Sequence, residues 1–165
     1  MKLKIIFLII FISFSHSSCA YKSLYKRNAF HAHKINILVK SKDNYENNIS
    51  LMKLILNERL NIKNSKPSNL KLIVSLERLT ANLGVNKDIY SFGRMLTFNV
   101  KYSFYDKKGL LKSGNLQGKS SFNVGGNPYG NKVSEEDASQ KIILSLAQNL
   151  SNIIAVSNFK RPVSP

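Results

Sequence analysis

The sequence predicts a two-layer α+β domain in which two helices cover one face of a four-stranded, mostly antiparallel sheet. The predicted elements follow in the order strand, helix, three strands and helix (β-α-β-β-β-α). Within residues 91–105, apolar and polar side chains alternate, which is typical of a sheet with one buried face. Both helical segments carry an apolar stripe along one side only. These three observations predict that both helices lie on one face and leave the other face polar and open.

The first strand and the first helix are predicted in the segment before Pro67. Residues 34–40 alternate between lysine-rich and aliphatic positions, which predicts a strand. Asp43 and Glu46 have the spacing of a capping box, and the apolar stripe that follows predicts a helix ending near residues 61–64. The stripe consists of Ile49, Met52, Leu56 and Leu60, with Leu51 and Ile55 beside it.

The second predicted strand, residues 70–83, changes phase in its middle. Its first half has apolar residues at even positions, and its second half has them at odd positions. A β-bulge near Glu77 and Arg78 would return the later apolar residues to the buried face. These later residues are Leu79, Ala81 and Leu83.

The third and fourth strands, residues 91–105 and 110–124, form a predicted hairpin. The turn between them contains Gly109, at a position where a positive φ is common. Gly114 and Gly118 interrupt the fourth strand, so they either weaken it or allow another element to pack closely.

The last predicted element is a helix that begins at Ser134. Residues 125–132 are rich in glycine and are expected to form a loop. Ser134 is a suitable N-cap, and the acidic residues 135–137 would lie at the positive end of the helix dipole. The apolar stripe consists of Ile143, Leu146, Ala147, Leu150, Ile153 and Ile154.

The N-terminus has the composition of an export signal. Lys2 and Lys4 precede the apolar run 5–14, and small residues follow it. A run of about ten residues is too short to span a bilayer, which needs about twenty. We therefore expect residues 1–18 to be a signal peptide.

Cys19 is the only cysteine of the chain and stands at the exit of this signal. The arrangement resembles a bacterial lipoprotein signal, in which cleavage before the cysteine is followed by attachment of fatty chains. His16 departs from the apolar residue usual at that position, and ordinary signal cleavage after Ala20 is the alternative. In lipoproteins, an Asp after the cysteine usually signals inner-membrane retention, and Ala20 here points to the outer membrane.

The expected organisation after the signal has three parts. Residues 19–33 form a lipidated tether, residues 34–157 the α+β domain, and residues 158–165 a flexible basic tail. The formal net charge is +16, and loss of Lys2 and Lys4 with the signal would lower it by two to +14. Such a charge favours an anionic partner, and export disfavours nucleic acid.

No catalytic or metal-binding constellation is evident in the sequence. The acidic residues are few, and His31 and His33 have no further ligands at useful spacing, so we interpret both as exposed linker residues. We therefore expect a protein that is not an enzyme and that needs no metal or cofactor.

Residues 19–25, Cys-Ala-Tyr-Lys-Ser-Leu-Tyr, resemble the C-G-F-x-P-L-Y start of mature lipopolysaccharide-assembly lipoproteins, the LptE-like family. Cys19, Leu24 and Tyr25 match, and Tyr21 is a conservative replacement for Phe. The family's Gly and Pro are replaced here by Ala20 and Ser23. Three later segments resemble the family's S-Y-N, Y-A and D-A motifs in the same order: Ser121-Phe122-Asn123, Tyr129-Gly130 and Glu136-Asp137-Ala138.

This resemblance implies a non-catalytic lipoprotein on the periplasmic side of the outer membrane. Such proteins plug and help to assemble the LptD-like β-barrel that exports lipopolysaccharide, and they assist its delivery to the outer leaflet. They bind the phosphates of the glycolipid through basic residues. The alternative is an auxiliary lipoprotein of a periplasmic lipid or ABC-type transporter, and a secreted hydrolase is a third possibility.

The candidate lipopolysaccharide-binding residues come from their position at strand ends, since no family motif aligns with these turns. Lys87 and Arg94 lie near the turn between the second and third strands, and Lys107 and Lys108 lie at the next turn. Ordinary solvated loop charges are the competing interpretation. We expect the Lys107–Lys108 tip to contribute most to binding.

Overall fold

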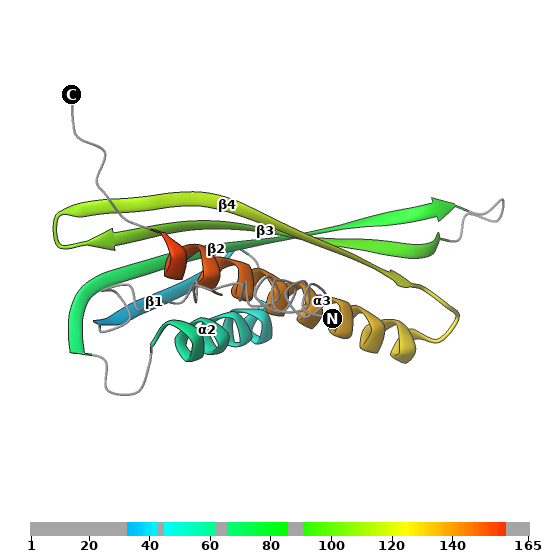
Figure 1. Ribbon diagram of the computed structural model, residues 1–165. Helices are drawn as coiled ribbons and strands as arrows, with labels where there is room; N and C mark the ends of the chain where they lie inside the picture. Colours follow the sequence, from blue (N-terminus) through cyan, green and yellow to red (C-terminus); the bar gives the residue numbers. More distant parts are fainter. Residues whose placement is uncertain (1–32, 43–44, 62–65, 86–90, 158–165) are drawn as a thin grey trace, which may run out of the picture.

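The computed structural model describes residues 33–42, 45–61, 66–85 and 91–157, which form a four-stranded sheet and two helices (Figure 1). The elements are β1 (His33–Ser41), α2 (Glu46–Leu60), β2 (Lys66–Val85), β3 (Ser91–Asp106), β4 (Gly109–Asn123) and α3 (Pro128–Val156). The strand order is β1-β2-β3-β4, with β1 parallel to β2 and the other pairs antiparallel. Both helices lie on one face of the sheet, so the predicted α+β class and element order are confirmed.

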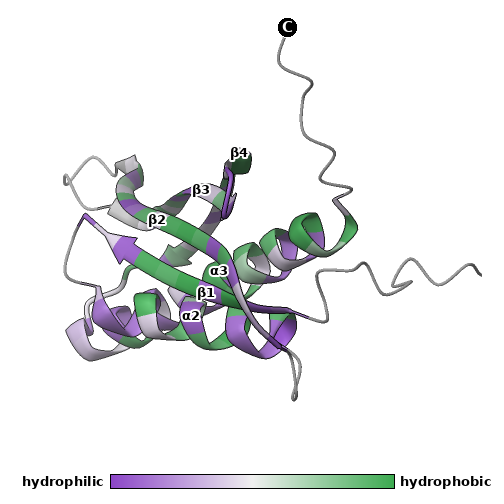
Figure 2. Cartoon of the chain, turned by 90° about the vertical axis from the view of Figure 1, so that its left-hand side faces the viewer, coloured by the Kyte–Doolittle hydropathy of each residue, from purple (hydrophilic) through white to green (hydrophobic). Residues whose placement is uncertain are grey.

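The hydrophobic core lies between the helices and the side of the sheet that faces them. Figure 2 shows apolar bands along the strands above the two helices. Along β3, alternate residues from Leu96 to Phe104 are buried, as the sequence pattern predicts. The helical stripes also face the core, although Ile49 and Ile153 are only partly buried. The largest fully buried side chains are Phe98, Phe104, Met52, Leu56, Leu72, Leu76, Leu96, Ile143, Leu150 and Ile154, together with Val74 and Val100.

The outer edge of β1 is partly covered by a side chain from the end of α2. Asn61, the C-cap of α2, accepts a hydrogen bond from the backbone N–H of Ile35 at 2.7 Å. Its Nδ2 group donates to the backbone carbonyl of Ile35 at 2.9 Å. An amide side chain therefore takes the place of a neighbouring strand at this point. It reduces the tendency of the unpaired edge of β1 to pair with a strand of another molecule.

The start of α2 differs from the predicted capping box. The helix begins at Glu46 with Tyr45 as N-cap, and the Tyr45 side chain makes no capping hydrogen bond. Asp43 lies outside the described residues, and the role predicted for it as N-cap is wrong because Tyr45 holds that position.

The start of α3 also differs from the prediction. The helix begins at Pro128 instead of Ser134, and Asn127 is its N-cap. The Asn127 side chain accepts hydrogen bonds from the backbone N–H groups of Tyr129 at 3.0 Å and Gly130 at 3.3 Å. An Asn cap followed by Pro at the first helical position is a strong start signal, which overrides the two preceding glycines. The acidic residues 135–137 consequently lie inside the helix, well past its first turn.

The predicted β-bulge at Glu77 and Arg78 is absent. Strand β2 pairs with β3 in one continuous register from Lys71, opposite Tyr105, to Leu83, opposite Gly93. Because the alternation continues, Arg78 faces the helices and Leu79 points to the opposite side. The apolar residues of β2 therefore change face at this point instead of returning to the core.

The two glycines of β4 allow close packing, as one of the two sequence interpretations proposes. A Cβ atom on Gly118 would lie 2.5 Å from Cγ2 of Ile142 in α3. A Cβ atom on Gly114 would lie 2.7 Å from the hydroxyl of Tyr102. Burial of Tyr102 raises the pKa of its hydroxyl above the ordinary value of 10.0.

We predict that Gly118→Ala destabilises the fold. The new methyl group would force α3 away from β4 or push Ile142 off its rotamer, and such overpacking costs about 1–3 kcal/mol of the free energy of unfolding. Denaturant unfolding measures the loss. Gly126→Ala is the control, because nothing lies within 4 Å of its Cβ position. Equal stability of the two variants would contradict the close packing of α3 on β4.

Candidate binding surfaces

The basic residues predicted to bind lipopolysaccharide do not form one site. Arg94 lies near the start of β3, whereas Lys107 and Lys108 follow the end of that strand. From position 94 to position 107 an extended strand covers about 43 Å, at about 3.3 Å per residue. A single phosphate cannot bridge this distance. Lys87 and the predicted lipidation residue Cys19 lie outside the described residues.

The turn between β3 and β4 presents Lys107 and Lys108 to solvent. Asp106 Oδ1 accepts a hydrogen bond from the backbone N–H of Lys108 at 2.7 Å, which fixes the turn. Gly109 has φ of 127°, a conformation that other residues rarely adopt. The local sequence Asp-Lys-Lys-Gly thus builds a tight turn and leaves both lysine side chains exposed.

A cavity of about 420 Å³ lies beside this turn and includes both lysines. The residues around it include two lysines, a histidine, a serine, an asparagine and one aspartate, and most of the exposed lining surface is apolar. The lining residues are His33, Ser68, Asn69, Leu70, Asp106, Lys107 and Lys108. Hydrogen-bond donors around positive charge suit a phosphate, and the apolar lining suits a nearby hydrocarbon group.

Sequence reasoning missed the contribution of β1 and β2 to this cavity. His33 is the first residue of β1, although the sequence interpretation placed it in the tether. Ser68, in the extension of β2 beyond its predicted start, donates a hydrogen bond to the carbonyl of Lys34 at 2.7 Å. The pairing of β2 with both β1 and β3 brings these residues to the same end of the sheet as the turn. Only the strand order could have revealed this proximity.

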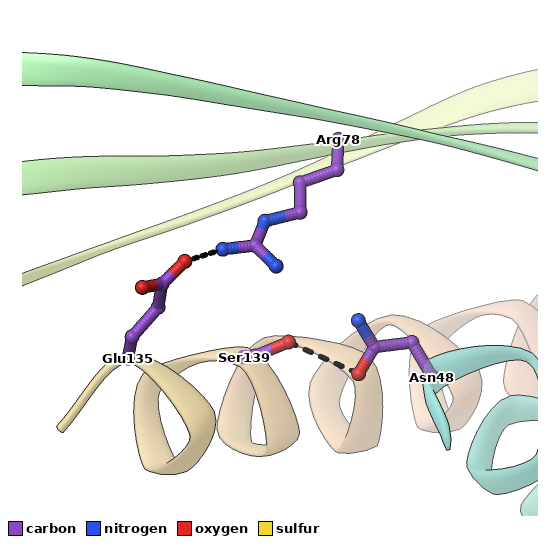
Figure 3. A network of polar contacts seen from close by, with 4 residues as sticks. All are labelled: Asn48, Arg78, Glu135 and Ser139. Carbon is purple, nitrogen blue, oxygen red and sulfur yellow. Dashed lines mark hydrogen bonds and ion pairs between the residues drawn. The ribbon is translucent and has the colours of Figure 1, made fainter. Parts of the chain in front are cut away.

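A second, larger groove of about 940 Å³ lies between the N-terminal halves of α2 and α3. Arg78 reaches into it from β2 and forms an ion pair with Glu135 of α3 (Figure 3). The guanidinium carbon of Arg78 also lies 4.5 Å from the centre of the Tyr45 ring. Beside it, Ser139 donates a buried hydrogen bond of 3.1 Å to Asn48 of α2. Only 11% of the Arg78 side chain is exposed, compared with 30% for Glu135.

These contacts give the groove a structural role. Arg78 joins the sheet to both helices at the end of the core, and the Asn48–Ser139 bond joins the helices to each other. Among the described residues, no three His, Cys, Asp or Glu side chains gather in a way that could hold a metal ion. The described helices also include none that is long and apolar enough to cross a membrane.

We predict that Glu135→Gln destabilises the fold by about 1–3 kcal/mol, because it leaves the largely buried Arg78 charge without its partner. Thermal or denaturant unfolding measures the loss. The neighbouring Glu136→Gln removes the same charge from an exposed position and is the matched control. Equal effects of the two variants would show that the Arg78–Glu135 pair does not stabilise the fold.

Comparisons with known proteins identify the fold. No protein-family model matches the sequence, and no curated protein matches it. Among solved structures, a candidate lipoprotein from Caulobacter crescentus has a TM-score of 0.55 and 17% identity, with coverage of 76% of this chain and 90% of that chain. The rare lipoprotein B of Shewanella oneidensis has a TM-score of 0.55 and 11% identity, with coverage of 73% and 93%.

A third similar structure comes from Helicobacter pylori, a candidate homologue of neuraminyllactose-binding hemagglutinin. It has a TM-score of 0.55 and 13% identity, and the match covers 78% of this chain and 86% of that chain. At these identities, the likeness establishes the fold alone. The chain has the fold of solved bacterial lipoproteins, in agreement with the fold that the family resemblance implies.

Proposed function

We propose that the protein is a non-catalytic outer-membrane lipoprotein that plugs and helps to assemble the barrel exporting lipopolysaccharide. In this proposal, Cys19 carries the lipid anchor, and the domain assists delivery of lipopolysaccharide to the outer leaflet. The export signal, the lipoprotein-like fold and the order of the family-like motifs support this function together.

The cavity beside the β3–β4 turn is the observation that carries the proposal. It places two exposed ammonium groups, Lys107 and Lys108, beside hydrogen-bonding groups and the apolar side chain of Leu70. Lipopolysaccharide presents phosphates next to acyl chains, and lysine binds phosphate as a point charge. The cavity therefore offers complementary groups for both parts of the glycolipid.

The outer surface of the domain also suits a barrel lumen. The side of the sheet away from the helices carries polar residues on β3 and β4, including Asn99 and Gln117, which share a hydrogen bond of 2.7 Å. Lumens of large outer-membrane barrels are polar and water-filled. A compact domain with such a face can lie inside one without burying unpaired polar groups.

We predict that replacing Lys107 and Lys108 together with Ala weakens binding of lipopolysaccharide by roughly tenfold, the loss expected for one to two charge-assisted contacts. Titration of the purified protein with lipopolysaccharide measures this loss. The double variant of Lys53 and Lys141 to Ala removes the same charge from the exposed surfaces of α2 and α3 and should bind normally. Unchanged binding by the first variant, or an equal loss in both, would contradict the turn as the binding site.

We predict that the protein co-purifies with a large β-barrel when outer membranes are extracted in gentle detergent. The mass of the mature N-terminus should equal that of an acylated Cys19. An inner-membrane transporter as the co-purifying partner would favour the alternative function in lipid transport. A mature chain with an unmodified N-terminus would contradict the lipid anchor.

A further inference from the structure

The charges of the described residues are divided unequally between the two layers of the domain. The helices carry four basic residues, Lys53, Arg59, Lys132 and Lys141, against five acidic residues, Glu46, Glu58, Glu135, Glu136 and Asp137. The side of the sheet away from the helices, here called the open face, carries the exposed lysines Lys40, Lys71, Lys101 and Lys119. Glu77 is the acidic residue on that face. The domain is therefore electrostatically polarised, with its positive side on the open face.

We propose that the open face docks on the surface of a bilayer containing anionic phospholipids. No described element covers this face, as Figure 1 shows. This surface is separate from the turn cavity. The proposed function turns the same face toward a barrel lumen, so docking on a bilayer describes the domain when it is outside the barrel, where the contact gives it a preferred orientation on the membrane.

The positions of the lysines match a surface better than a single ligand. In the sheet register, Lys40 of β1, Ser75 of β2 and Lys101 of β3 lie in one row across the strands. Strands are about 4.8 Å apart, so Lys40 and Lys101 are separated by about 10 Å. Lys71 and Lys119 lie in other rows, toward opposite ends of the sheet. The positive charge is thus spread in two dimensions, as a plane of headgroups requires.

Apolar side chains on the same face favour a membrane over a soluble polyanion. Leu79 is 51% exposed and lies in the same row as Thr97 and Lys119. Ala81, also exposed, pairs with the partly buried Met95. The continuous register of β2 puts Leu79 and Ala81 on the same face as the lysines, with Lys119 two strands away from Leu79. Apolar groups flanked by lysines are typical of surfaces that lie at the boundary between headgroups and acyl chains.

The position of β1 at the edge of the sheet agrees with this orientation. His33 begins β1, the edge strand that also contributes Lys40 to the open face. If Cys19 carries a lipid, as in the proposed function, the residues from 20 to 32 can span at most about 45 Å. The anchor and the open face can then reach the same bilayer, and each contact raises the effective concentration of the other. The distribution of charge and the strand register are the same with or without the anchor.

The test uses the whole mature protein reconstituted with vesicles of phosphatidylcholine alone or with about one third phosphatidylglycerol. A membrane-impermeant amine reagent modifies accessible lysines, and mass spectrometry reports the rate at each position. Lys101 and Lys119 should react roughly fivefold more slowly on the anionic vesicles. Attraction to such a surface favours the membrane-bound state of each lysine by about that factor, and the bound amine is shielded from the reagent. Lys53 and Lys141 on the helices should react equally on both. About 0.5 M salt should abolish the protection.

Charge variants distinguish binding through the open face from a general attraction of a basic protein to anionic lipid. In a double variant of Lys101 and Lys119 to Gln, protection of Lys40 and Lys71 should fall, whereas the matched variant of Lys53 and Lys141 to Gln should keep it. Equal thermal unfolding of the two variants confirms that both are folded. Equal lysine reactivity on the two vesicle types, or equal loss of protection in both variants, would overturn the proposal. Failure to find a barrel partner would contradict the proposed function and leave this result unaffected.

Discussion

The uninterrupted pairing of β2 with β3 is the constraint on which most of this structure depends. A strand alternates its side chains strictly, so a continuous register sends Arg78 toward the helices and Leu79 away from them. Arg78 then reaches Glu135 and Tyr45, and these contacts join the sheet to both helices where the core ends. The same alternation exposes Leu79 in one row with Thr97 and Lys119. One backbone arrangement thus creates both the polar junction and the apolar part of the open face.

Much of the fold could be predicted from the sequence because its patterns are local. The alternation from Leu96 to Phe104 and the stripe from Ile143 to Ile154 both identify buried faces, and the structure buries most of those residues. The predicted start of α3 at Ser134 is wrong, because a stronger start signal precedes Ser134 and its acidic neighbours. Asn127 and Pro128 lie seven and six residues earlier and form a better cap. The bulge was predicted on the assumption that every apolar run must face the core, which does not hold where the helices end.

The candidate sites could be predicted only in part. Lys107 and Lys108 were identified because a turn that follows an amphipathic strand must be exposed, and the structure places both beside a cavity. Their separation from Arg94 follows from the length of β3, which the sequence already indicated. The ion pair of Arg78 and Glu135 joins residues 57 positions apart, and the Asn48–Ser139 bond spans 91. No local pattern contains such contacts, because they depend on how the helices cross the sheet.

The side chain of Asn61 makes the two edges of the sheet unequal. It engages both backbone groups of Ile35, so a strand from another molecule would have to displace it to extend the sheet beyond β1. A linear fibre grows only when one edge of each copy can accept the opposite edge of the next. Since the Asn61 amide obstructs one of these edges, growth of a fibre by edge-to-edge strand pairing is disfavoured. Pairing through β4 alone leads to a closed, two-fold dimer and stops there.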